Sequence, residues 1–238
     1  LAVVEREVCE AEARRGNVFV ARDAAYRFRR GAEGFSALGM GSPDAQADHR
    51  FFTGAGISAG DLLSFSRQFV SPDGQSETAS FLLAFAADLR APDAFFFTCQ
   101  RANAPAVDRS ALQSHPNGAI SIREVVLTEP NPADFQYLLQ DVVRQRTVDA
   151  DSFGIRFSSA NGGISVLTPA GFSAAFGGDT HCHARGLRLR AVVFAAADLS
   201  TLAELLARNH IPCDLRGGRL VVPPGPGQGA VFAFEEAR

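Results

Sequence analysis

The chain has 238 residues, 46% of them hydrophobic, so it can bury a substantial core in one large or two small domains. Its formal net charge is -3, and the basic residues are all arginines scattered among acidic ones, so no basic patch favours nucleic-acid binding. No apolar run approaches the roughly 20 residues that span a bilayer, and no signal peptide is recognisable. The four cysteines are far apart, which favours reduced thiols and a cytoplasmic location.

The first 33 residues lack a complete pattern of their own. Leu1–Val4 resembles a last strand, and Ala21–Arg30 resembles a polar connecting helix. We therefore expect this segment to be the tail of a further copy of the repeated motif described next, with the rest of that copy upstream.

A strand–helix–strands pattern begins at Gly34. Phe35–Gly41 alternates like a strand, and Ser42-Pro43-Asp44 supplies a helix cap with a proline at the first helical position. The helix is predicted to end near Phe52, before two glycines. Three further strands are predicted at Leu62–Phe69, Thr78–Ala86 and Ala94–Cys99. The order is βαβββ.

The same order recurs twice. The second copy has a strand at Ile120–Thr128 and a helix that opens at Asn131-Pro132. Asn161-Gly162 then predicts a hairpin turn between two strands. The third copy begins with a strand at Leu187–Ala195. It continues with a helix capped by Asp198 or Ser200 and with strands at Asp214–Leu215, Arg219–Val222 and Ala230–Glu235.

A βαβββ sheet is covered by its helix on one face only, so the other face must be buried against a second copy. We therefore predict an α+β fold of tandem βαβββ motifs forming paired half-barrels with a funnel between curved sheets. The predicted domains are residues 1–114, whose second motif spans 34–101, and residues 115–238, with motifs at 115–176 and 186–238.

Several segments resemble one known family. They are Phe65-Ser66-Arg67, Pro72-Asp73-Gly74, Ala94 to Gln100, His115 to Ala119 and Gly218 to Pro224. Together with the repeated motif, they resemble the bacterial glyoxalase-like domain proteins of the vicinal oxygen chelate superfamily, which includes glyoxalase I, bleomycin-resistance proteins and extradiol dioxygenases.

The resemblance implies a divalent metal, such as Fe, Mn, Ni or Zn, that stabilises negative charge on two adjacent substrate oxygens. First-strand ligand positions would fall at Ser36, at Glu124 and at Arg190 or Ala191. The matching last-strand segments contain no Asp or Glu; they are Ala94–Gln100, Gly163–Leu167 and Ala230–Phe234. The usual metal site is therefore largely absent from the sequence.

His115 is the first polar candidate for a site. It precedes a strand within the run His-Pro-Asn-Gly, which fixes the backbone tightly. Its imidazole would act in a pocket as base, hydrogen-bond donor or metal ligand, or it would cap the turn through hydrogen bonds. Both readings stay open.

His115, His183 and Glu235 form a second candidate, a site of two histidines and one carboxylate. Their separations are each about one motif long, as ligands from successive motifs require. Against this, His181 and His183 lie in a Gly-rich linker, where histidines are usually solvated.

Four residues are predicted to contact a substrate: Arg67, Gln100, Asn117 and Phe97. Arginine suits a carboxylate or phosphate because its guanidinium group donates two parallel hydrogen bonds; the alternative for Arg67 is a surface ion pair. The Phe95-Phe96-Phe97 run is typical of a core, and the abundant phenylalanines predict an apolar, phenyl-lined funnel.

The function implied is a glyoxalase-like protein that acts on or binds a small organic molecule. As an enzyme it would be a lyase of the lactoylglutathione-lyase type, an isomerase or a dioxygenase, with His115 as its polar centre. The alternative is a non-catalytic protein that sequesters a small molecule. No nucleic-acid or membrane partner is expected, and a homodimer is left open.

Overall fold

The computed structural model describes residues 6–31, 33–70, 76–103, 114–159, 161–178, 184–226 and 228–237. The chain divides into two compact parts. The N-terminal part comprises residues 1–32 and 36–108, and the C-terminal part comprises residues 33–35 and 109–238.

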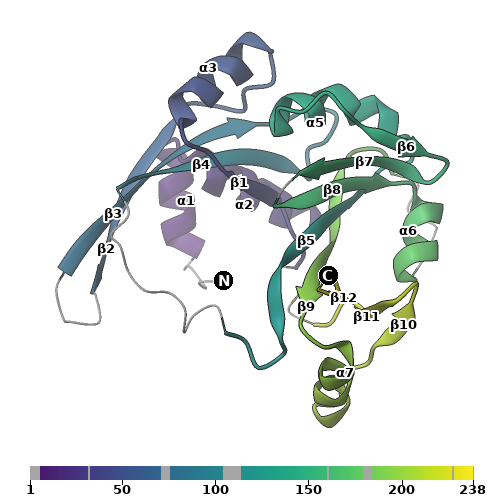
Figure 1. Ribbon diagram of the computed structural model, residues 1–238. Coiled ribbons are helices and arrows are strands. Elements are labelled where there is room, and N and C mark those ends of the chain that lie inside the picture. Colours follow the sequence, from purple (N-terminus) through teal and green to yellow (C-terminus); the bar gives the residue numbers. More distant parts are fainter. Residues whose placement is uncertain are drawn as a thin grey trace. The chain divides into compact units, whose positions relative to one another are not determined.

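The N-terminal part contains one βαβββ motif preceded by two helices (Figure 1). The elements are α1 (Arg6–Arg14), α2 (Val18–Arg30), β1 (Ala37–Gly41), α3 (Ala45–Gly54), β2 (Leu63–Val70), β3 (Ser76–Ala86) and β4 (Phe95–Asn103). The strand order is β1-β4-β3-β2, with β1 parallel to β4. The predicted strands and helix of this motif are confirmed, and α1 was not predicted.

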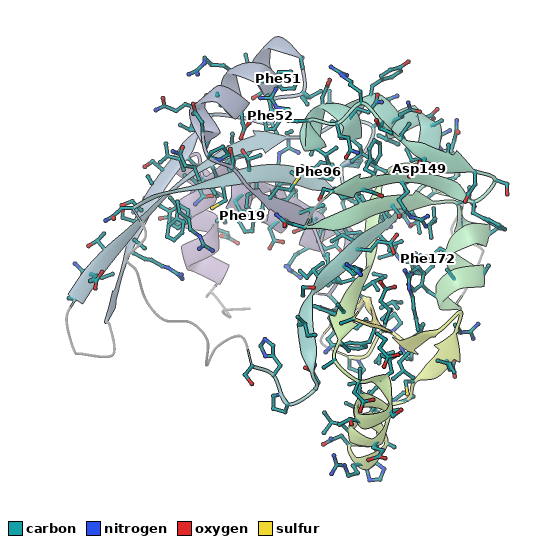
Figure 2. All side chains as sticks on the ribbon, in the orientation of Figure 1. Phe19, Phe51, Phe52, Phe96, Asp149 and Phe172 are labelled. Atoms are coloured by element: carbon teal, nitrogen blue, oxygen red, sulfur yellow. The ribbon has the colours of Figure 1, made fainter. Side chains whose placement is uncertain are left out.

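The helices α2 and α3 pack on opposite faces of this sheet. Phe52 of α3 and Phe96 of β4 are fully buried on one face. On the other face, the Phe19 ring of α2 (labelled in Figure 2) meets the rings of Phe95 and Phe97 edge to face. The centroid of the Phe19 ring lies 5.7 Å from the centroid of each. We expected this face to be buried against another motif; within the described residues α2 covers it instead.

Ion pairs hold α2 against the loop before β4. Arg29 and Arg30 donate to the two carboxylate oxygens of Asp93 at 2.8 and 2.5 Å. Burial raises the pKa of Asp93, but the hydrogen bonds from the two arginines outweigh it and hold the pKa below its ordinary value. Asp23 of α2 also accepts a 2.6 Å hydrogen bond from Ser36 Oγ.

The C-terminal part contains the other two predicted motifs, which are confirmed. The first consists of β5 (Ala119–Thr128), the 3-10 helix η1 (Pro132–Phe135), α5 (Gln136–Val143), β6 (Asp149–Asp151), β7 (Gly154–Ser159) and β8 (Gly162–Leu167). The second consists of β9 (Arg188–Ala196), α7 (Leu199–Arg208), β10 (Asp214–Arg216), β11 (Arg219–Val222) and β12 (Val231–Glu236).

These two motifs form one eight-stranded sheet in the order β10-β11-β12-β9-β5-β8-β7-β6. The first strands, β5 and β9, pair antiparallel in the middle, and each is parallel to the last strand of its own motif, β8 or β12. The two halves of the sheet therefore have the same arrangement, as paired half-barrels require.

Different helices pack on the two faces of the eight-stranded sheet. Leu202 and Leu206 of α7 pack with Leu220, Val222 and Phe234 on one face. A helix that was not predicted, α6 (Pro169–Phe176), packs on the opposite face, which we call the α6 face. Its apolar members are Val126, Leu167, Phe172, Phe176, Ala191, Val193, Val221, Val231 and Ala233.

Local chemistry explains why α6 forms. The Thr168 side chain accepts a hydrogen bond from Gly171 N at 3.1 Å, and Pro169 occupies the first helical position. The helix ends at Gly177, whose φ of 78° favours glycine. A Cβ on Gly171 would lie 2.8 Å from the carbonyl oxygen of Phe153, so glycine permits the close approach of α6 to that loop.

Candidate functional site

Charged side chains gather on the α6 face at one end of the strands. We call this group the arginine–carboxylate cluster; its members are Arg123 and Glu124 of β5, Arg156 of β7, Ser165 of β8, Arg219 of β11 and Glu235 of β12. Both motifs of the C-terminal part contribute to it, so the pairing of β5 with β9 is what assembles the cluster.

Glu124 is the buried centre of the cluster, with 7% of its surface exposed. Its Oε1 accepts hydrogen bonds from Ser165 Oγ and, at 3.4 Å, from Arg156 Nε. Its Oε2 accepts a hydrogen bond from Arg219 at 3.2 Å. Both carboxylate oxygens are therefore engaged, as a buried charge requires.

Arg219 links the two carboxylates. Besides Glu124, it donates to Glu235 Oε2 at 2.9 Å. Glu235 Oε1 accepts a further hydrogen bond from Arg123 Nε at 3.2 Å. Each carboxylate is thus bound by two guanidinium groups, one of which is shared.

Two β-bulges shape the α6 face. On β5, Ile122 pairs with Phe194 and Glu124 with Val193, so Arg123 is an extra residue in the ladder. The bulge allows the adjacent Arg123 and Glu124 to join the same network, although consecutive strand residues normally face opposite ways.

The second bulge is on β9. Val126 pairs with Ala191 and Leu127 with Leu189, which leaves Arg190 as the extra residue. The Arg190 guanidinium carbon lies 5.0 Å from the ring centroid of Phe172, while its neighbour Ala191 belongs to the same apolar cluster as Phe172.

Phenyl rings of α6 adjoin the charged cluster. The guanidinium carbon of Arg219 lies 5.9 Å from the ring centroid of Phe176. Phe172 and Phe176 stand 5.0 Å apart and are both buried, and Phe172 extends from α6 toward the strands (Figure 2). The α6 face therefore combines a buried apolar core with an adjoining polar cluster.

The cluster is positively charged and partly open to solvent. Three arginines and two glutamates leave one net positive charge. The side chains of Arg123 and Arg156 are 46% and 51% exposed. Each uses Nε to bind a carboxylate, and within the described residues their terminal nitrogens have no partner.

The metal implied by the resemblance does not fit this donor set. The oxygens of Glu124 and Glu235 are engaged by three guanidinium groups, which would repel a divalent cation and would have to be displaced by it. In the N-terminal part, Ser36 Oγ donates to Asp23, and β1 and β4 contain no Asp or Glu. No group of three His, Cys, Asp or Glu in the described residues is placed to hold a metal.

The predicted ligands are therefore only partly located. Glu235 lies in the cluster, whereas His115 is exposed in the turn before β5 and His183 lies outside the described residues. The carbonyl of His115 accepts a 2.9 Å hydrogen bond from Gly118 N, and Asn117 Oδ1 accepts one from Ala119 N at 3.1 Å. His115 and Asn117 thus support the turn, and their roles in catalysis or substrate binding stay predictions.

The other three predicted substrate contacts belong to the N-terminal part. Arg67 stacks over Phe81, with its guanidinium carbon 5.5 Å from the ring centroid. Gln100 Oε1 accepts a 3.0 Å hydrogen bond from Ala45 N and so caps α3. Phe97 lies against Gly39 and Phe19 in the core under α2. Each has a structural partner, and a role in ligand binding stays a prediction.

A second buried carboxylate belongs to the framework. Glu129, fully buried, accepts hydrogen bonds from Arg185 Nε and Gly186 N, each at 2.6 Å, and from Asn131 N at 3.2 Å. It ties the end of β5 to the segment before β9. The hydrogen bonds that Arg185 donates to Glu129 and Asp134 raise the pKa of Arg185.

The sequence interpretation missed Arg123, Arg156, Ser165 and Arg219. Their signal was the presence of arginines or a serine in otherwise largely apolar strands. Glu124 was noted only as a possible ligand position.

The cysteines and the lengths of the helices were also considered in the sequence prediction. Cys99 and Cys213 are free thiols, and burial raises the pKa of Cys99. Among the described residues, no helix is both long enough and apolar enough to cross a membrane.

Comparison with known proteins agrees with this architecture. The chain is similar in structure to a hypothetical protein from Staphylococcus aureus, with a TM-score of 0.56 and 10% identity over 92% of this chain and 71% of that one. It is also similar to the 2,3-dioxygenase LapB from Pseudomonas sp. KL28, with a TM-score of 0.53 and 14% identity over 86% of this chain and 72% of that one. No curated protein matches the chain. These identities show a shared fold alone.

The family follows from the sequence itself. A family model described as "Glyoxalase-like domain" matches residues 1–143, more than half of the 238 residues. The chain therefore belongs to the glyoxalase-like domain family.

Proposed function

We propose that the protein binds a small organic anion on the α6 face of its C-terminal part without using a metal. The single observation that carries this proposal is that Glu124 and Glu235 are engaged by Arg123, Arg156 and Arg219. Glu124, at the position where the resemblance implies a metal ligand, instead binds two guanidinium groups.

The carboxylates orient the arginines for this role. Glu124 and Glu235 bind the Nε atoms of Arg156 and Arg123, which fixes the planes of the two guanidinium groups. The terminal nitrogens of both arginines remain as donors on the solvent side. A planar carboxylate accepts two parallel hydrogen bonds from such a group.

The apolar part of the ligand would lie beside α6, whose phenyl rings Phe172 and Phe176 are themselves buried. Arg219 and Arg190 already stack on Phe176 and Phe172, so the rings and the positive charges are neighbours. An aromatic or aliphatic carboxylate combines the two chemistries. The protein would then hold its ligand rather than transform it, as the sequestering alternative requires.

The rival is a metal-assisted lyase, isomerase or dioxygenase centred on His115, His183 and Glu235. It requires Glu235 to leave Arg123 and Arg219 for a cation. The cytoplasmic location inferred from the cysteines belongs to both alternatives and stays a prediction.

Isothermal titration of the full chain with benzoate at low salt tests the proposal, with acetate and benzyl alcohol as comparison probes. We expect benzoate to bind more tightly than either, and salt to weaken it because part of the attraction is electrostatic. Arg156→Met should weaken benzoate about tenfold, the loss of one charge-assisted hydrogen bond at a half-exposed site.

Arg146→Met is the matched control, because Arg146 is 75% exposed and pairs with Asp141 at 3.2 Å, away from the cluster. It should leave benzoate binding unchanged. No saturable binding of benzoate, or equal affinity in the wild type and Arg156→Met, would contradict the proposal.

A further inference from the structure

Arg190 occupies a position in β9 that is equivalent to the position of Arg123 in β5. Each is the extra residue of a β-bulge in the ladder between the two strands. Three regular pairs separate the bulges: Glu124 with Val193, Val125 with Val192, and Val126 with Ala191. Because the strands are antiparallel, a local twofold axis through the middle pair exchanges Arg123 with Arg190.

The same axis relates the last strands of the two motifs. It exchanges β8, which pairs with β5, and β12, which pairs with β9. The registers of these pairs place Leu167 of β8 at the position that corresponds to Glu235 of β12. Arg123 Nε donates to Glu235 over 3.2 Å. At the position where Arg123 has this carboxylate, Arg190 therefore has a leucine.

The charge of Arg190 has no counterion among the described residues. Its partly exposed guanidinium group has no hydrogen bond or ion pair there, and its carbon lies 5.0 Å from the ring centroid of Phe172. Leu167 and Phe172 belong to one apolar cluster, so the surroundings on this side are apolar. Phe172 is the fourth residue of α6, and the N-terminal turn of a helix is itself positive. An anion beside Arg190 would neutralise this charge.

We propose that Arg190 binds the carboxylate of a small organic acid at a site separate from the arginine–carboxylate cluster. The ligand carboxylate would take the position that Glu235 has beside Arg123. A guanidinium group that lies over a ring keeps the N–H groups at its edge, which can donate two parallel hydrogen bonds to a carboxylate. The two bulges lie about 12 Å apart along the strands, so one carboxylate does not reach both arginines.

Nuclear magnetic resonance of the full chain titrated with acetate tests the proposal, with chloride at the same ionic strength as the comparison. The side-chain Nε–H signal of Arg190 and the backbone amide signal of Ala191 should shift with one shared dissociation constant for acetate. Chloride should cause a smaller shift because it does not accept two parallel hydrogen bonds from one guanidinium group. These signals of the wild type do not depend on a variant folding.

Arg190→Met is the diagnostic variant. Methionine keeps an unbranched apolar side chain beside Phe172 and removes the guanidinium group. The dissociation constant for acetate, measured at the Ala191 amide, should rise at least about tenfold. Arg208→Met is the matched control, because Arg208 is exposed on α7, and it should leave the dissociation constant unchanged.

The outcomes separate this site from the proposed site at the cluster. A wild-type Arg190 Nε–H signal that shows no saturable shift, or that responds equally to acetate and chloride, would overturn the proposal. An unchanged dissociation constant at Ala191 in Arg190→Met would also overturn it. Saturable acetate binding at Arg190 without benzoate binding at the cluster would support the Arg190 site and contradict the proposed function alone.

Discussion

Arg219 donates a hydrogen bond to Glu124 over 3.2 Å, although the two residues lie 95 positions apart and belong to different βαβββ motifs. The bond makes the charged cluster a joint product of both halves of the sheet. It also provides a charged partner for the buried carboxylate of Glu124, which precedes the apolar residues Val125 to Leu127 of β5. Removing Arg219 would leave each carboxylate with one guanidinium partner, Arg156 for Glu124 and Arg123 for Glu235.

Arg219→Met should therefore destabilise the C-terminal part. We expect a loss of about 2–3 kcal/mol in the free energy of unfolding, below the roughly 3–5 kcal/mol for a fully buried pair because Glu235 and Arg219 keep some contact with water. Urea denaturation measures it. Arg208→Met, an exposed change on α7, should have little effect; equal stability of the two variants would show that the cluster contributes nothing to folding.

Phe172→Ala tests whether α6 is a packed part of the α6 face. Phe172 is 3% exposed, so its removal should cost about 3–5 kcal/mol of stability through lost burial and a cavity. Thermal and urea unfolding measure the loss. Tyr137→Ala, at a site 75% exposed, is the control and should cost far less. A loss below about 1 kcal/mol for Phe172→Ala would contradict the packing described for α6.

Asp93 should make the N-terminal part sensitive to acid. Its pKa is lower in the folded protein than in the unfolded chain, so the ionised group stabilises the fold above about pH 4, the ordinary range of an Asp. That contribution is lost as the pH falls through the folded pKa. At pH 6, Asp93→Asn should have a lower free energy of unfolding than the wild type. As the pH falls below 5, the variant should lose less of that free energy than the wild type does. Urea denaturation at each pH measures both differences. Parallel pH profiles would contradict it.

Gln100 offers a direct comparison of a structural role with a ligand-binding role. Its side chain accepts a hydrogen bond from the first residue of α3, so Gln100→Ala should cost about 0.5–1.5 kcal/mol of stability. Because the proposed anion site lies in the C-terminal part, benzoate affinity should stay the same. Weaker benzoate binding with unchanged stability would instead support the substrate contact predicted from the sequence.

Regular, local signals explain what could be predicted from the sequence. The cap of α3, which is Asp44 rather than a residue before Pro43, the hairpin that ends at Gly162 and the helix after Asp198 each depend on residues close in the chain. These signals located all three motifs. By contrast, α6 was missed because its eight residues begin with Pro169 and include Gly171, which is typical of a linker.

The cluster was missed for a different reason. The bulges at Arg123 and Arg190 interrupt the two-residue period of their strands, so alternation assigns these side chains to the wrong face. The partners of Glu124 are also distant in sequence, at Arg156, Ser165 and Arg219. Such pairings depend on the register of the whole sheet, which no local pattern reveals.

We propose that guanidinium groups, not a metal ion, bind the carboxylates of Glu124 and Glu235 in the C-terminal part. The most direct test is the metal content of the full chain after equilibrium dialysis against Fe(II), Mn(II), Ni(II) or Zn(II), measured by mass spectrometry for the wild type and Glu124→Gln. We predict less than one equivalent of each metal and no difference between the two proteins. One bound equivalent in the wild type that is lost in Glu124→Gln would contradict the account.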